Sequence, residues 1–574
     1  MSSVNNFESA GRSVLDRLGI AEDPLIGADP VAFLRSLVAA GGALVKNPSG
    51  TAAANGRLAI GLAAAVRAAA GRAVGADPSA PPVAPARSDR RFSDPAFAEN
   101  PLYFLLEQQY LLSCQLVEDL LDAAQVDATQ EMKARFAARF IVDSLAPTNT
   151  LAGNPAALRE AFDTGGKSVL RGAKNLVGDL VHNGGWPSQV DASGFEVGVN
   201  MAATPGAVVY RSDLIELIQY EAQGEQVHAV PLLFCPPWIN KYYIMDLAPG
   251  RSLIEWAVQH GHTVFTISYR NPDSTMREVN FDDYLYQGPL DAVRVVREIT
   301  GAPEVNTVSV CLGGTLTAIA LAHNAKIGDR SIKSATFLNT LTDFSAPGVL
   351  GVFCDEPTIV GLERQMSKQG FLDSNKMAHT FDALRPNDLI FNYVVNNWLL
   401  GKRPPSFDLL VWNKDSTRMP AKMHSQYLRS CYLNNDFARG EFEIDGAKLE
   451  PGKIDIDTYV LAAVDDHIVP WVSAYKTTQL FGGDRRFVLS TSGHIAGIVN
   501  PPGPKAKHWT NDDLPEDAQQ WKDNATLQTG TWWDDWAAWI AKQGGPKVEA
   551  PSYLGSQDHP VIESAPGSYV RVRV

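Results

Sequence analysis

Three residues that lie far apart in this chain have side chains suited to nucleophilic catalysis. Cys311 follows the apolar run Val305–Val310 and precedes Leu-Gly-Gly-Thr, a pattern typical of a tight turn between a buried strand and a helix. Asp466 and His494 each follow another β-branched or aliphatic run that ends in small and polar residues. A thiol, a carboxylate and an imidazole in this order predict a cysteine nucleophile with a histidine base and an acid beside it.

The turn around Cys311 has the spacing of a nucleophile elbow. In α/β-hydrolases a G-x-S-x-G turn exposes the nucleophile between a strand and a helix, and the acid and the histidine follow in that order along the chain. Here Ser309 replaces the first glycine, Cys311 replaces the serine, and Gly313 keeps the last position. An isolated match of this kind more often marks a buried structural cysteine. The acid and the histidine downstream favour the catalytic interpretation.

The acid and the base each have a neighbour that could take their place. Asp465 and Asp466 are adjacent, and because side chains alternate at the end of a strand, only one of them is expected to face the site. We choose Asp466, from the family match described below. His467 could compete as the base, but a histidine directly after the acid is interpreted as packing or orienting its loop. His494 lies in a Ser-Gly-His-Ile-Ala-Gly loop and is the expected general base.

A second apolar strand supplies the expected oxyanion hole. Residues 230–235 are apolar and end at two prolines, which cannot donate to a strand ladder. The loop that follows carries Ile239, whose backbone N–H is expected to stabilise an oxyanion together with that of Leu312. On its own the segment also fits a rigid Pro-Pro turn without chemistry. Asn240, in the same loop, is our candidate for a substrate contact.

Five segments of the chain together resemble the polyhydroxyalkanoate synthases, most closely the single-polypeptide class I type. The similarity runs from about Arg90 to the last residues of the chain. The segments are PPWINKYYIMDL at 236–247, ISYRNPD at 267–273, VCLGGT at 310–315, DHIVPW at 466–471 and SGHIAGIVNPP at 492–502. The elbow departs from the family at Ser309, where glycine is usual, and Tyr269 stands where tryptophan is common. Neither change removes a reacting group.

The resemblance implies both a reaction and its residues. Cys311, Asp466 and His494 match the catalytic cysteine, aspartate and histidine of the family, and Ile239 and Leu312 match its oxyanion donors. The implied activity is polymerisation of 3-hydroxyacyl-CoA thioesters to a polyester with release of CoA, through an acyl-cysteine. The implied partners are the growing polyester chain, the granule surface and a second copy of the chain in a homodimer. No cofactor is expected, since the CoA thioester is itself the substrate.

The chain is expected to fold in three parts that position these residues. Residues 1–88 are alanine-rich and end in a proline-rich linker. Residues 89–204 have a mostly helical pattern. Strands and helices alternate over 205–574, which predicts a parallel sheet in an α/β-hydrolase catalytic domain. Between about 343 and 453 the alternation gives way to aromatic-rich helices and loops, and we interpret this stretch as an inserted cap that excludes water and sets acyl selectivity.

Several helices are also predicted. Residues 31–45 and 56–74 have helical patterns, and a leucine stripe at 102–121 predicts an amphipathic helix. By default the stripe packs against the catalytic domain, but it could also dimerise or contact polymer. The aromatic stripe consists of Trp532, Trp533, Trp536, Trp539 and Ile540. It is expected to pack the last helix on the sheet, with contact to polymer as the alternative.

Composition indicates a large cytoplasmic enzyme. The chain has 574 residues, and its five cysteines are irregularly spaced without C-x-x-C, which argues against a disulfide framework or a zinc cluster, so no metal is expected. The first residues lack the pattern of a secretory signal. The apolar run 58–66 is shorter than the roughly 20 residues that a membrane span needs, so no transmembrane segment is expected. The net charge of −14 disfavours nucleic-acid binding.

Binding of CoA requires local basic groups despite this charge. Arg385, in the expected cap, is one candidate, and an ion pair inside the cap is its alternative interpretation. Two rival functions remain: a cysteine-dependent hydrolase of the dienelactone hydrolase or depolymerase type, and a granule-coating protein without activity. Acyl chain length stays open at this stage.

Overall fold

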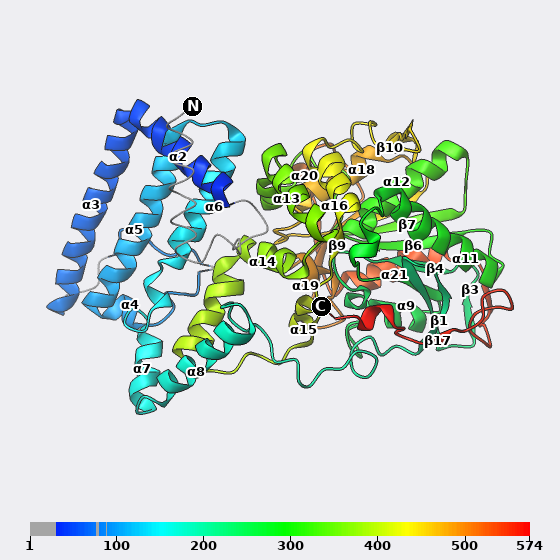
Figure 1. The fold of residues 1–574 in the computed structure, drawn as a ribbon, viewed down its shortest axis with the longest axis horizontal. Helices are drawn as coiled ribbons and strands as arrows, with labels where there is room; N and C mark the ends of the chain where they lie inside the picture. Colours follow the sequence, from blue (N-terminus) through cyan, green and yellow to red (C-terminus); the bar gives the residue numbers. More distant parts are fainter. Residues whose placement is uncertain (1–29, 76–79, 88, 574) are drawn as a thin grey trace. The chain divides into compact units, whose positions relative to one another are not determined.

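The structure is a computed structural model that describes residues 30–75, 80–87 and 89–573. The chain divides into two compact units, whose elements are labelled in Figure 1. The first unit contains the described residues up to Asp191 together with His379–Ser406. The second contains Ala192–Ala378 and the described residues from Phe407 onward. The second unit carries all three residues of the expected triad.

The first unit is helical. Its main helices are α2 (Pro30–Lys46), α3 (Pro48–Ala73), α5 (Pro101–Ala124), α6 (Ala128–Ser144), α7 (Pro155–Asp163) and α8 (Lys167–His182). The predicted helix at 31–45 is α2, and the one at 56–74 corresponds to α3, which ends one residue earlier, at Ala73. That helix begins earlier than predicted because Asn47 caps its first turn and Pro48 suits its first position. Across the described residues, none of the helices is both long and apolar enough to span a bilayer.

The leucine stripe at 102–121 lies on α5, and its buried members contact helices of the same unit. Leu112 is buried on a helix that packs against the alanine-rich α3. Leu111 joins an aromatic cluster with Phe92, and Leu121 packs with alanines of α2 and α6. These leucines therefore form the core of the helical unit, whereas the sequence predicted packing against the catalytic domain.

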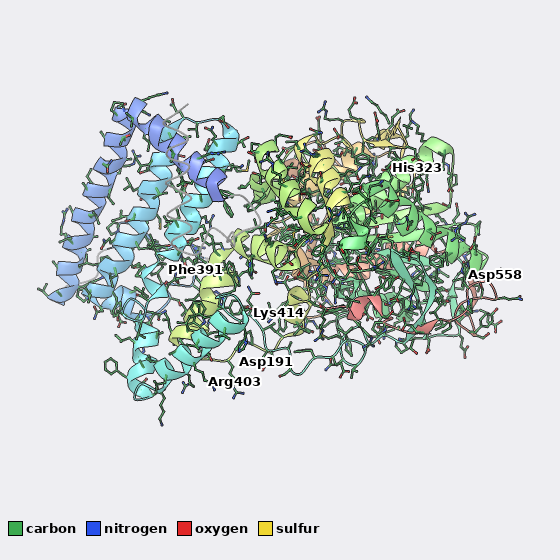
Figure 2. The ribbon with its side chains drawn as sticks, in the orientation of Figure 1. Asp191, His323, Phe391, Arg403, Lys414 and Asp558 are labelled. Carbon is green, nitrogen blue, oxygen red and sulfur yellow. The ribbon has the colours of Figure 1, made fainter. Side chains whose placement is uncertain are left out.

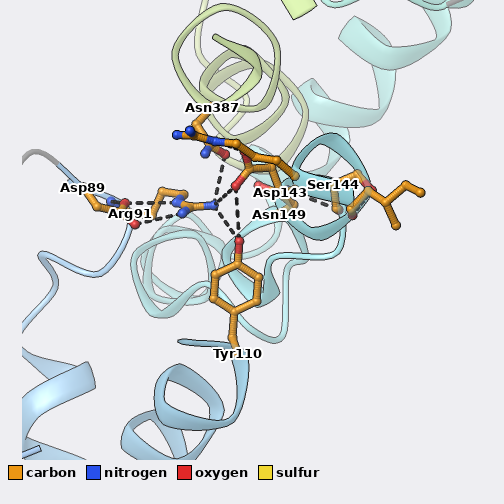
Figure 3. Close-up of polar contacts among 9 residues, drawn as sticks. Asp89, Arg91, Tyr110, Asp143, Ser144, Asn149 and Asn387 are labelled. Atoms are coloured by element: carbon orange, nitrogen blue, oxygen red, sulfur yellow. Dashed lines mark hydrogen bonds and ion pairs between the residues drawn. The ribbon is translucent and has the colours of Figure 1, made fainter. Parts of the chain in front are cut away.

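Arg91 connects four parts of the first unit (Figure 3). Its guanidinium donates hydrogen bonds to Asp89 at 2.8 Å, to the hydroxyl of Tyr110 on α5 at 2.9 Å and to Asp143 on α6 at 3.1 Å. It also donates to Asn387 at 3.0 Å. Because the Arg91 side chain is largely buried, each of these partners is needed to satisfy its charge and its donors.

Residues 379–406 pack against α8. The indole N–H of Trp398 donates to Asp179 at 2.7 Å, and a Cβ at Gly172 would lie 1.9 Å from the carbonyl oxygen of Trp398, so glycine is required there. The stretch 343–453, predicted as one inserted cap, is thus divided between the units: its middle belongs to the first and its flanks to the second. Figure 2 labels three residues of the first unit, Asp191, Phe391 and Arg403.

The second unit is built on a mixed sheet that has 11 strands among the described residues. In spatial order they are β15 (Thr526–Thr529), β14 (Lys507–Thr510), β13 (Arg485–Ser490), β12 (Asp457–Ala463), β7 (Ile332–Leu338), β6 (Val305–Val310), β4 (Leu232–Cys235), β5 (Val264–Tyr269), β2 (Ile215–Tyr220), β1 (Gly206–Arg211) and β17 (Glu563–Ser564).

The centre of this sheet is parallel and its edges are antiparallel. The strands from β13 to β5 pair in parallel. At one edge β2, β1 and β17 are antiparallel, and at the other β14 and β15 are antiparallel. The predicted α/β class is confirmed, but the parallel sheet expected from residue 205 onward is mixed. A short turn joins β1 to β2, and such a turn permits only antiparallel pairing.

Helices cover both faces of the sheet. α11 (Asp291–Thr300) and α12 (Leu312–Ile327) bury one face, and α9 (Leu253–Gln259) and α21 (Trp532–Gln543) bury the other. The side chains of α21 confirm that the aromatic stripe is core, because Trp532, Trp533 and Trp536 are buried. The indole N–H of Trp536 donates to Thr336 on β7 at 3.0 Å.

Candidate active site

Cys311 lies on a strained turn between β6 and α12. Its φ of 49° is in the left-handed region, which a residue with a Cβ rarely adopts. Its backbone N–H donates to the carbonyl of Leu338 on the neighbouring β7 at 2.9 Å. A Cβ at Gly313 would lie 2.2 Å from the carbonyl oxygen of Cys235, at the end of β4, so only glycine allows the helix to start this close to the sheet. This geometry is that of a nucleophile elbow.

Ser309 occupies the position where glycine is usual, and the structure accounts for its hydroxyl. The side chain is fully buried on β6, and its Oγ donates to Thr317 Oγ1 on α12 at 2.8 Å. Thr317 in turn donates to the carbonyl of Gly313 at 2.9 Å. Because the hydroxyl is satisfied, it can be buried without a large cost. It also connects the strand and the helix on either side of Cys311.

His494 and Asp466 form a buried pair. β12 ends shortly before Asp466, and β13 ends shortly before His494, so both side chains lie at the carboxyl edge of the parallel strands. His494 was predicted in a flexible loop, but it is the first residue of the short helix α19 (His494–Ile498). The ring Nδ1 of His494 lies 2.7 Å from Asp466 Oδ2. The other oxygen of Asp466 accepts the backbone N–H groups of Ile468 and Val469, each at 2.8 Å. Asp465, by contrast, is exposed.

The Cys311 side chain lies close enough to the imidazole of His494 for its charge to act on the ring. Since Nδ1 of His494 faces Asp466, we assign Nε2 to the sulfur. Burial by itself lowers the pKa of His494, but the charges of Asp466 and Cys311 and the hydrogen bond to Asp466 outweigh it, so the pKa is raised. The surroundings of His494 therefore favour the charged form of its ring.

Two backbone N–H groups are available near this site. Leu312 is the first residue of α12, so its N–H has no acceptor within the helix. Ile239 lies in the loop after β4. Within the described part of the chain, the N–H groups of Leu312 and Ile239 both lack a backbone acceptor. Both belong to chain segments at the carboxyl edge of the sheet, next to the elbow. An oxyanion hole needs two such free donors, so both stay candidates for it.

Asn339 and Thr340 contact the site and were not predicted from the sequence. They follow β7, and Asn339 has a φ of 45°. The Asn339 carboxamide donates to the backbone carbonyl of His494, and the Thr340 hydroxyl lies 3.2 Å from the carbonyl oxygen of Cys311. The available signal was that β7, like β12 and β13, is followed closely by polar residues.

Comparisons with known proteins identify the family. Residues 88–257 match the family described as Poly-beta-hydroxybutyrate polymerase (PhaC) N-terminus, and residues 231–501 match the alpha/beta hydrolase fold. The poly(3-hydroxyalkanoate) polymerase subunit PhaC of Cupriavidus necator is 43% identical over 492 residues, which cover 84% of this chain and 83% of the relative. The poly(3-hydroxyalkanoate) polymerase of Methylorubrum extorquens is 40% identical over 578 residues, covering 100% of this chain and 94% of the relative.

This chain belongs to the poly(3-hydroxyalkanoate) polymerases. The resemblance inferred from the five sequence segments is confirmed, and the chain is an acyltransferase of the polyester-forming kind. Poly(3-hydroxyalkanoate) polymerase 1 of Ectopseudomonas oleovorans is another relative, 41% identical over 86% of this chain and 88% of its own length. Among solved structures, a hydrolase from Pseudomonas aeruginosa PA01 has 16% identity and a TM-score of 0.30, over 51% of this chain and 92% of that one.

Aromatic side chains from the flanks of the predicted cap form a packed cluster near the nucleophile of this polymerase. Tyr427 and Tyr432 have ring centroids 5.5 Å apart, and Phe344 packs on Tyr432 at 4.9 Å. Burial raises the pKa of both tyrosines, and the charge of Cys311 raises it further, so both hydroxyls stay protonated near the sulfur. An aromatic cluster with neutral hydroxyls therefore lies near the nucleophile.

The two candidate substrate contacts have different surroundings in this polymerase. The side-chain oxygen of Asn240 accepts the backbone N–H of Lys241 at 3.0 Å, next to the proposed oxyanion donor. Arg385 belongs to the first unit, where it pairs with Asp388 at 2.6 Å and keeps 47% of its side chain exposed. An ion pair was the alternative that the sequence analysis gave for Arg385, and the pair with Asp388 is of that kind. Over the described ranges, no three His, Cys, Asp or Glu side chains are arranged to hold a metal ion.

Proposed function

We propose that this chain polymerises (R)-3-hydroxyacyl-CoA thioesters into a polyhydroxyalkanoate with release of CoA, through an acyl group carried on Cys311. The observation that carries the proposal is the buried pair of His494 and Asp466 at the carboxyl edge of the sheet, where the charge of Cys311 acts on the His494 ring. The membership of the chain in the polymerase family supports the choice of reaction. Sulfur suits this reaction because exchange between thioesters is nearly isoenergetic, so the acyl group stays activated.

The first step transfers the acyl group to the enzyme. His494 accepts the proton of Cys311, and the thiolate attacks the carbonyl carbon of the CoA thioester. The N–H groups of Leu312 and Ile239 donate to the oxyanion that forms, and each such donor contributes about 3 kcal/mol to lowering the barrier. The carbon–sulfur bond to CoA then breaks, and the imidazolium returns its proton to the leaving thiolate. CoA departs as a free thiol and the acyl-cysteine remains.

The second step extends the polymer. The acceptor is the 3-hydroxyl of the next unit or of the growing chain, and His494 removes its proton as the oxygen attacks the acyl-cysteine. The bond to sulfur breaks, an oxoester forms, and the proton passes from His494 back to the sulfur of Cys311. This step is downhill, because an oxoester is more stable than a thioester. Asp466 orients the imidazole and stabilises its charged form, or helps to activate the hydroxyl.

The aromatic cover over Cys311 has a task in this scheme. Water competes with the hydroxyl acceptor for the acyl-cysteine, so a polymerase must keep water away from the sulfur. The packed rings of Tyr427, Tyr432 and Phe344 provide an apolar surface for this purpose. The proposal includes acyl selectivity set by this lining. It also includes a homodimer at the surface of cytoplasmic polymer granules, as the family resemblance implies.

Product analysis tests the reaction against a cysteine-dependent hydrolase, which would use the same triad. The purified protein is incubated with C4 and C8 3-hydroxyacyl-CoA, and free CoA, free hydroxy acid and insoluble polyester are measured. We expect CoA with insoluble polymer and little free acid. Equal amounts of CoA and free acid would identify a hydrolase. A Cys311→Ala variant that releases CoA at the wild-type rate would contradict the acyl-cysteine.

A further inference from the structure

The loop that carries Ile239, residues 236–241, is held in place by hydrogen bonds from residues that lie far from it in sequence. Its one bridge to another segment joins Asn240 to Ser416 in the described structure, and no strand continues it. Before Ile239, the carbonyl of Trp238 accepts the hydroxyl of Thr417 at 2.9 Å. A short helix of the same unit, α15 (Asp408–Lys414), ends just before these residues. Figure 2 labels its last residue, Lys414.

After Ile239, the loop is held by Lys241. The carbonyl of Lys241 accepts the indole N–H of Trp412, on α15, at 2.8 Å. The Lys241 ammonium lies 2.7 Å from Asp415 and donates to the backbone carbonyls of Val570 and Val572 at 2.7 and 2.9 Å. An ammonium has three donors, so these three acceptors use all of them. Lys241 therefore connects the loop, the end of α15 and the segment around Val570.

The Lys241 side chain is almost fully buried, with 3% of its surface exposed. Burial lowers its pKa, and the charge of Asp415 works against that shift. Asp415 is fixed in turn by the hydroxyl of Tyr243, which donates to its other oxygen at 2.8 Å. A buried cation of this kind holds one geometry, because the loss of any partner leaves a charge or a carbonyl unsatisfied.

We propose that Lys241 is a positioning residue for the oxyanion hole, which places the N–H of Ile239 by binding Asp415 and the carbonyls of Val570 and Val572. This inference rests on the proposed function. Donors of an oxyanion hole act only when they lie 2.7–3.1 Å from the oxygen, and a misplacement of 1 Å can cost about 100-fold in rate. Two segments remote in sequence, 412–417 and 570–572, thereby control the acylation of Cys311.

The test compares two carboxylates that border α15 and each pair with a cation. Asp415 pairs with Lys241, whereas Asp408 pairs with Arg251 at 2.5 Å and does not contact the oxyanion loop. We expect Lys241→Met to lower kcat for CoA release from 3-hydroxybutyryl-CoA by about 10- to 100-fold, with KM changed less than about threefold. We expect Asp415→Asn to lower kcat by about 5- to 20-fold. The matched control, Asp408→Asn, should stay within about twofold, because its ion pair with Arg251 is separate from the contacts of Lys241.

Two further variants keep the result interpretable. In the double variant Lys241→Met/Asp415→Asn no charge is left unpaired, and we expect its kcat to match that of Lys241→Met, because both residues act through one contact. A shortened chain that lacks residues 570–574 should lose kcat in the same way while Lys241 and Asp415 remain. Circular dichroism and thermal melting establish that each variant is folded.

Several results would overturn the inference. One is a folded Lys241→Met protein, or its double variant, with kcat within twofold of the unchanged protein and only a lower melting temperature. Another is an equal loss of kcat in the Asp408→Asn control. The proposed function is tested separately, since it fails if the unchanged protein releases no CoA or if Cys311→Ala retains the activity.

Discussion

The carboxamide of Asn339 donates a hydrogen bond to the backbone carbonyl of His494. The hydroxyl of the next residue, Thr340, donates a hydrogen bond to the backbone carbonyl of Cys311 at 3.2 Å. Both residues are buried at the end of β7, which lies between the strands that lead to the nucleophile and to the acid. One short turn thus contacts the backbone of both the proposed nucleophile and the proposed base, and it sets the distance between them.

Asn339→Gly is expected to lower kcat for CoA release by about tenfold. Glycine adopts the positive φ of Asn339 without strain, so the variant removes the carboxamide but keeps the backbone conformation. The measurement is steady-state release of CoA, together with a melting temperature. If kcat is unchanged while the protein is folded, the carboxamide does not position His494.

Asp466→Asn is expected to lower kcat by at least about 100-fold, because the amide neither stabilises an imidazolium nor holds the same tautomer. Asp465→Asn is the matched control, since it makes the same chemical change at an exposed neighbour. Its kcat should stay within about twofold of the unchanged protein. The rate of CoA release measures both. The reverse ranking would assign the acid to Asp465.

The stability contribution of His494 is expected to decrease as the pH rises. Burial lowers the pKa of His494, but the charge of Asp466 outweighs burial, so the folded pKa lies above the ordinary value of 6.5. The charged form is therefore favoured by folding. This stabilisation is fully present below pH 6.5 and is lost as the pH rises through the folded pKa. The melting temperature of the unchanged protein minus that of His494→Gln, measured from pH 6 to pH 9, should decrease steadily. A difference that grows with pH would contradict this sign.

Gly313→Ala is expected to abolish CoA release, because the new Cβ would lie 2.2 Å from a backbone oxygen of β4 and would displace the start of α12. Gly178→Ala is the control. Gly178 lies in α8, where an added Cβ meets nothing within 4 Å, and alanine there should raise the free energy of unfolding by about 0.5–1 kcal/mol. Activity and thermal melting are measured for both. An active Gly313→Ala protein would show that the elbow has room to adjust.

The local sequence was sufficient for features whose chemistry is local. The spacing of Ser309, Cys311 and Gly313 predicted a strand–turn–helix elbow, and the structure shows a positive φ at Cys311 in that turn. Apolar runs followed by polar residues located Asp466 and His494 just beyond two strand ends, although His494 begins the short helix α19 rather than lying in a loop. Helical spacing placed the tryptophans of α21 in the core. These patterns are readable because strand and helix periodicity is determined by neighbouring residues.

Tertiary structure decided what depends on residues far apart in the chain. Asn339 and Lys241 are polar residue types that usually lie on surfaces, and only the fold brings them against His494 and Val570. The same holds for residues 379–406, which pack with α8 of the first unit although they lie within the predicted cap. Hydrogen bonds and close packing of this kind depend on three-dimensional proximity, and a pattern of neighbouring residues contains no record of it.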